Sequence, residues 1–135
     1  MNIFDLLRNK GLIESYGVSF NEIEQYQKKL YNAGVANIPL DYAKFLTKIN
    51  GIQTDTLSLF GIGQKNSFVR GIFEENSIAG TTSRDELFLG DNFTEYLIYD
   101  WQKKSYLIID KITHKQLKIF PFLQDTLEYF LREYL

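Results

Sequence analysis

The feature that most constrains the fold is a short amphipathic segment bounded by Pro39 and Gly51. Proline is tolerated in the first turn of a helix, and glycine supplies the left-handed residue at which a helix ends. Four apolar side chains between these two residues share one helical face: Tyr42, Phe45, Leu46 and Ile49. A second apolar run, Leu57 to Phe60, follows closely and ends at Gly61. The pattern predicts a delimited helix followed by a short strand.

This pattern resembles the middle of the SUKH (Smi/Knr-like) superfamily, in which a proline-started Tyr-x-x-Phe-Leu helix ends in Asn-Gly and a strand then reaches a Phe-Gly pair. The matching residues are Pro39, Tyr42, Phe45, Leu46, Asn50, Gly51, Phe60 and Gly61. The likeness continues more weakly through Leu87 to Phe120 and into the closing helix, so it covers most of the chain from Ile38 onward. It implies an α+β fold and, for most bacterial members, an immunity protein that binds and neutralises a secreted toxin domain.

Composition favours one folded domain spanning residues 1–135. Hydrophobic residues make up 44% and aromatic residues 16% of the chain, which is enough to bury a sizeable core. The chain has no cysteine, and its N-terminus mixes charged and apolar residues, so we expect a cytoplasmic protein without a signal peptide or membrane span. With a net charge of −2, the chain has no broad positive field of the kind that direct nucleic-acid binding needs. Mild acidity suits a basic partner such as a nuclease toxin, but so small a charge is more simply explained as ordinary for a soluble domain.

Two helices are expected before the proline-started one, over residues 3–10 and 20–33. Ser19 and Glu22 have the spacing of a capping box, with Val18 and Ile23 placed as a hydrophobic staple, and Gly34 ends the second helix. After Leu57 the chain changes to short apolar runs separated by polar turns, which predicts strands. These strands are expected over residues 57–60, 68–74, 86–89, 95–100, 105–110 and 116–120.

A last helix is expected after Pro121, because apolar residues recur at helical offsets from Leu123 to Tyr134. The whole chain therefore predicts an α+β single domain with N-terminal helices. Its antiparallel, mostly meander sheet has about five to six strands, and the C-terminal helix packs on that sheet.

No segment predicts catalysis, a metal site or a cofactor site. Gly61-Ile62-Gly63-Gln64-Lys65-Asn66 lacks the glycine spacing of a dinucleotide or phosphate loop and is interpreted as a turn. His114 is the only histidine and is expected in an exposed turn, while Ser105 and Asp110 lack the context of a catalytic triad. Six carboxylates at strand ends could converge as an acid and a base, but solvation at strand ends explains them more simply: Asp85, Glu86, Asp91, Glu95, Asp100 and Asp110.

The predicted partner-binding surface consists of two loops, Asn76 to Asp91 and Trp101 to Lys104. Its candidate residues are Asp85, Glu86, Asp91, Asn92, Glu95 and Trp101, with the acidic groups steering association and the aromatic ring anchoring it. For Trp101 itself, burial against a neighbouring helix is slightly favoured over contact with a partner. We expect a non-enzymatic protein, a monomer or weak homodimer, whose partner is a cognate toxin. The alternative is a regulatory scaffold, or a module that holds a small ligand between the third helix and the sheet.

Overall fold

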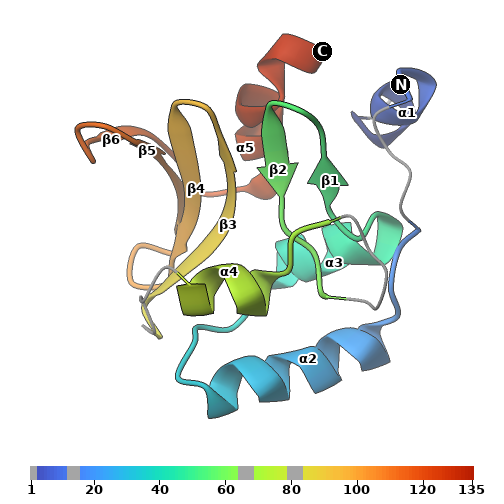
Figure 1. The fold of residues 1–135 in the computed structure, drawn as a ribbon, viewed down its shortest axis with the longest axis vertical. Coiled ribbons are helices and arrows are strands. Elements are labelled where there is room, and N and C mark those ends of the chain that lie inside the picture. The colour runs from blue at the N-terminus through green and yellow to red at the C-terminus, as the bar shows by residue number, and fades with distance from the viewer. Residues whose placement is uncertain (1–2, 12–15, 64–68, 79–83) are drawn as a thin grey trace.

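The computed structural model describes residues 3–11, 16–63, 69–78 and 84–135 (Figure 1). Within these ranges, one six-stranded antiparallel sheet follows chain order from β1 to β6. The strands are β1 (Ile52–Gln53), β2 (Leu57–Leu59), β3 (Glu86–Asn92), β4 (Glu95–Asp100), β5 (Ser105–Asp110) and β6 (Gln116–Phe120). The helices are α1 (Ile3–Asn9), α2 (Phe20–Asn32), α3 (Leu40–Lys48), α4 (Ile72–Ile78) and α5 (Leu123–Phe130), followed by the 3₁₀ turn η1 (Arg132–Tyr134). The predicted α+β domain with a meander sheet and a C-terminal helix is confirmed.

Helix α2 begins and ends as its sequence predicts. The Ser19 hydroxyl accepts a hydrogen bond from the Glu22 backbone amide, and the Glu22 carboxylate accepts one from the Ser19 amide, which completes the capping box. At the other end Gly34 has φ +74°. The Gly34 amide donates to Tyr31 and the Val35 amide donates to Leu30, which is the hydrogen-bond pattern of a Schellman motif.

Helix α3 starts after Pro39 but ends differently from the prediction. Its last residue is Lys48, and Ile49 leaves the helix in an extended conformation. Gly51 does have φ +89°, but it directs the chain into β1 instead of capping the helix. A Cβ atom at Gly51 would lie 2.5 Å from the Leu59 carbonyl oxygen, so close approach of the next strand requires glycine here.

The core lies on one face of the sheet against α3 and α5, and buried residues of α2 and α4, such as Leu30 and Ile72, belong to it as well. Cross-strand partners such as Leu97 with Ile108 and Tyr99 with Tyr106 point to this core face and are buried. The phenol of Tyr106 donates to Asp41 of α3 over 2.5 Å, and Asp41 also accepts from the Leu123 amide at the start of α5. One carboxylate therefore joins the sheet to both helices.

The strand predicted over residues 68–74 is wrong: the chain makes a single bridge at Gly71 and then enters helix α4. Residue 68 lies outside the described residues. Ile72 is fully buried, and Asn76, one helical turn later, is 1% exposed. The Asn76 side chain donates to the Phe88 carbonyl and accepts from the Phe88 amide over 2.9 and 3.0 Å. The Asn76 side chain thus makes the hydrogen bonds with the β3 backbone that a neighbouring strand would otherwise make. These bonds favour a helix over a strand for this segment.

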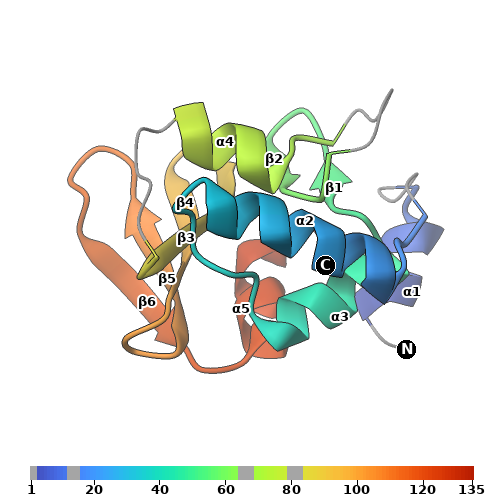
Figure 2. The same ribbon diagram turned by 90° about the horizontal axis from the view of Figure 1, so that it is seen from below.

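The two edge strands of the sheet, β1 and β6, differ in length and exposure. β1 is a two-residue strand that the sequence did not predict, and it pairs with β2. At the other end β6 pairs with β5, and the β5–β6 hairpin projects on the side of the domain opposite α1 (Figures 1 and 2). Opposite the core face, Phe88, Ile98, Leu107 and Ile119 share what we call the outer face.

Candidate functional site

The six predicted partner-binding residues separate into two groups at opposite ends of the β3–β4 hairpin. Asp85, Glu86 and Trp101 lie at the end where Glu86 pairs with Asp100. Asp91, Asn92 and Glu95 lie at the other end, beside the tight turn of the hairpin. The predicted loop is also shorter than expected. Asn76 belongs to α4, residues 86–91 belong to β3, and residues 79–83 lie outside the described part of the chain.

Trp101 is held at the first position of the β4–β5 turn. Its backbone amide donates to the Asp85 carbonyl over 2.7 Å, which places these two predicted residues side by side. Asp100 closes the turn by accepting from the Gln102 and Lys103 amides. Lys104 then takes φ 49°, a left-handed conformation that completes the reversal.

The indole of Trp101 is half-buried, because one side of the ring packs against the protein. Its Nε1 donates to the Asn37 carbonyl over 2.9 Å, and its ring meets that of Tyr99 edge to face at 5.1 Å. Burial, followed by the charges of Asp41 and Asp100, raises the pKa of Tyr99, which keeps that phenol neutral beneath the indole. Trp101 therefore packs on the segment that follows α2, while part of its ring stays accessible.

An open hollow of about 260 Å³ lies next to this ring. Its walls are Tyr31 at the end of α2, the segment Val35–Asn37, Arg84 and Trp101. The Arg84 guanidinium stacks 4.0 Å from the centre of the Tyr31 ring and donates to the Tyr31 carbonyl over 3.1 Å. We call Tyr31, Arg84 and Trp101 the Trp101 cluster. It combines the three residue types that most often dominate binding energy in protein interfaces.

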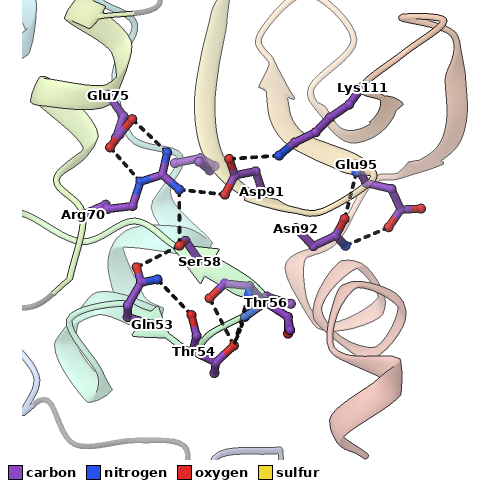
Figure 3. A network of polar contacts seen from close by, with 12 residues as sticks. Gln53, Thr54, Thr56, Ser58, Arg70, Glu75, Asp91, Asn92, Glu95 and Lys111 are labelled. Atoms are coloured by element: carbon purple, nitrogen blue, oxygen red, sulfur yellow. Dashed lines mark hydrogen bonds and ion pairs between the residues drawn. The ribbon is translucent and has the colours of Figure 1, made fainter.

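Asp91 belongs to a separate network on the outer face (Figure 3). Arg70 forms a two-bond ion pair with Glu75, at 2.7 and 3.0 Å, and a third bond of 2.8 Å to Asp91. Lys111 lies 3.4 Å from the other Asp91 oxygen. The hydrogen bonds to Glu75, with the nearby carboxylate charges, raise the pKa of the Arg70 guanidinium. The negative charge of Asp91 is thus neutralised inside the domain, which weakens its predicted role in steering a partner.

Glu95 is also committed to internal contacts. It is 3% exposed and accepts hydrogen bonds from Asn92, Tyr129 and Arg132. Asn92 in addition accepts from the Thr94 and Glu95 amides and so closes the β3–β4 turn. Burial and the Glu95 carboxylate raise the pKa of Tyr129. These contacts attach the C-terminal segment to the sheet.

Ser105, His114 and Asp110 do not come together as a catalytic triad. Ser105 and Asp110 occupy opposite ends of β5, five residue steps or about 17 Å apart in an extended strand. His114 is exposed in the β5–β6 turn, as predicted, and Asp110 accepts hydrogen bonds there from Ile112 and Thr113. These hydrogen bonds lower the pKa of Asp110. Across residues 3–11, 16–63, 69–78 and 84–135, no three His, Cys, Asp or Glu side chains are grouped as metal ligands.

The sequence analysis names neither Tyr31 nor Arg70 as a candidate, and it includes Arg84 only as part of the predicted loop Asn76 to Asp91. Tyr31 directly follows the buried Leu30 and was not singled out, although it leaves the apolar stripe of α2 and is 57% exposed. Arg84 is separated from Tyr31 by 53 positions, so no local pattern connects them. Arg70 lies in the segment wrongly interpreted as a strand.

Comparison of the sequence with protein-family models and with curated proteins finds no match. Every helix in the described ranges is too short or too polar to cross a bilayer.

Proposed function

We propose that this chain is a non-enzymatic binding protein that recognises one protein partner through the Trp101 cluster. The observation that carries the proposal is the convergence of Tyr31, Arg84 and Trp101 around one open hollow. A half-buried ring of fixed orientation loses little side-chain entropy when a partner covers it. Glu86, two positions after Arg84, is exposed and so stays accessible to a partner.

We further propose that the partner is a toxin domain and that the chain is a cytoplasmic immunity protein of the SUKH type. The support is the resemblance of the sequence, together with the contacts that the resembling residues make. Tyr42 donates to the Phe60 carbonyl, and the Asn50 side chain bonds both backbone groups of Ile62. Gly61 lies against the Asn50 backbone, where a Cβ atom would approach to 2.3 Å. The separated parts of the motif thus form one packed junction.

The test is purification of the tagged protein from its native cells, with mass spectrometry and size-exclusion chromatography of whatever it retains. We expect one stoichiometric partner that carries a toxin-like domain and is poisonous when expressed alone. Recovery of the protein alone, from cells shown to express the candidate toxin, contradicts the proposal.

The same partner then tests the site. Arg84→Ala and Trp101→Ala each remove a member of the cluster, and we expect each to weaken binding by roughly thirtyfold, the loss typical of an interface hot spot. Tyr16→Ala is the matched control, because Tyr16 is 89% exposed and lies outside the cluster. Trp101 is the only tryptophan, so its fluorescence should change when the partner binds. Unchanged affinity in both cluster variants rules out this site.

A second candidate function is the binding of a small amphipathic ligand. An open groove of about 800 Å³ lies between α1, α3 and α5, instead of between the third helix and the sheet as expected. Its lining is mostly apolar, including Phe4, Phe45 and Leu127, with Lys44 and Lys48 on one wall. Native mass spectrometry of the purified protein tests this function: a retained small molecule that Leu127→Trp displaces supports it, and an unliganded mass argues against it.

A further inference from the structure

β6 combines two properties that are unusual for a strand of this sheet. Within the described residues it has a neighbouring strand on one side only. Its two aliphatic side chains, Leu117 and Ile119, are 46% and 45% exposed, whereas Leu97 of β4 and Ile108 of β5, on the core face, are fully buried. Exposed aliphatic residues on an edge strand favour pairing with another chain.

Lysine residues are concentrated on β6 and on the segment that leads to it from the β4–β5 turn. Residues 103–118 contain five lysines and one aspartate, a net charge of +4, although the whole chain carries −2. The remaining residues therefore carry −6. The positive charge is therefore concentrated on one segment, which spans the β4–β5 turn, β5, the β5–β6 turn and β6.

Three of these lysines lie along β6 without a carboxylate partner. Lys103 crosses from the β4–β5 turn and donates to the Gln116 side chain over 3.3 Å. Lys118 extends toward the Tyr129 ring, 5.9 Å from its centre, and Lys115 is exposed directly before the strand. Among the described residues none of the three forms an ion pair, in contrast to Lys111, which contacts Asp91.

We propose that β6 is a docking edge for an acidic, extended segment of a partner protein, which adds a further strand to the sheet. Backbone hydrogen bonds supply affinity, apolar side chains cover Leu117 and Ile119, and carboxylates pair with Lys103, Lys115 and Lys118. A second copy of this chain fits poorly, because it would bring another lysine-rich edge against this one. This surface shares no residue with the Trp101 cluster, although Lys103 belongs to the same β4–β5 turn as Trp101, and the inference does not depend on the proposed function.

The experiment uses the full-length chain and two capped seven-residue peptides. One peptide alternates glutamate with valine, and the other carries lysine in place of glutamate. We expect the glutamate peptide to bind at least about tenfold more tightly, with an affinity that falls as salt is raised, since exposed charges are screened. Amide hydrogen exchange should slow in β6 and not in β1 when that peptide is bound.

The variants Lys115→Glu and Lys118→Glu are expected to reverse the preference for the glutamate peptide. Lys28→Glu is the matched control, because it makes the same charge change at an exposed position of α2 and should leave binding unchanged. Trp101→Phe should also leave it unchanged, which separates this edge from the toxin proposal. Absence of binding at about 1 mM glutamate peptide overturns the inference. So does equal binding of the two peptides, or a dimer of the free chain that Ile119→Lys dissociates.

Discussion

The hydroxyl of Tyr42 lies 2.5 Å from the carbonyl oxygen of Phe60, to which it donates a hydrogen bond in the fully buried core. The contact joins α3 to the end of β2 across 18 positions of sequence. Burial raises the pKa of Tyr42 well above its ordinary value, so the phenol stays protonated and remains a donor. This contact gives the tyrosine of the motif a structural role.

Tyr42→Phe should lower the free energy of unfolding by about 1–3 kcal/mol, because the Phe60 carbonyl loses its phenolic donor in a buried site. Urea unfolding measures the change. Tyr16→Phe is the control, since the Tyr16 side chain is 89% exposed and should contribute little. Equal stability of the two variants would show that this hydrogen bond does not hold α3 to the sheet.

Gly61→Ala should be destabilising by roughly 1–3 kcal/mol, the usual cost of forcing extra atoms into a packed site. The new Cβ atom would lie 2.3 Å from the Asn50 backbone oxygen, which cannot move without disturbing β1. Gly63→Ala is the matched control, because there the nearest atoms belong to the movable carboxylate of Glu74, at 3.2 Å or more. Thermal unfolding should separate the two variants, and similar midpoints would contradict the prediction.

Arg70→Gln should lower the free energy of unfolding by about 1–2 kcal/mol. The change leaves Glu75 and Asp91, with side chains only 17% and 15% exposed, without their shared cation. Lys29→Gln is the comparison, because its ion pair with Glu74 spans 3.9 Å between two half-exposed groups and should contribute less than about 0.5 kcal/mol. Denaturant titrations at low and high salt measure the free energy of unfolding of both variants. A larger loss in Lys29→Gln than in Arg70→Gln would contradict the prediction.

Stability should fall as the pH rises from 10 toward 12. Burial is the main cause that raises the pKa of Tyr26 from 10.0 to about 12. The folded state therefore holds the phenolic proton more tightly than the unfolded state. This contribution is fully present below pH 10 and is lost as the pH approaches 12. Tyr26→Phe should flatten the alkaline decline, while a Tyr16→Phe control should leave its slope unchanged; urea unfolding across pH 8–11 checks both.

Several elements could be predicted because their signals are local. The capping box of Ser19 and Glu22 marks the start of α2, and Gly34 marks its end. The β4–β5 hairpin follows from two continuous apolar runs, over residues 96–99 and 106–109, separated by a connection of hairpin length. Capping hydrogen bonds and side-chain periodicity depend on residues that are close in sequence, so they can be recognised from a single segment of the chain.

The segment after Arg70 could not be predicted in this way. Its apolar Ile72 and Phe73 suit a strand, but the Asn76 side chain bonds Phe88, and the Phe73 amide donates to the Tyr26 hydroxyl. Those contacts favour the helix, and they come from segments distant in sequence. The same distinction between local and long-range signals applies to the candidate site. Trp101 is predicted because a tryptophan in a turn is conspicuous, and Arg84 falls in a predicted loop, whereas nothing local indicates that both lie beside Tyr31.

The sequence by itself determined the α+β class, most helix and strand positions, and the positions of turns, because these depend on hydrophobic period and capping residues. Tertiary structure alone decided which charges are used internally. Asp91 and Glu95 looked available for a partner, yet each is paired with an arginine or lysine from another element. Tertiary structure also decided which residues surround Trp101 and which lysines near β6 form no ion pair among the described residues. The physical reason is that side-chain pairing depends on distance in space, which a linear pattern does not encode.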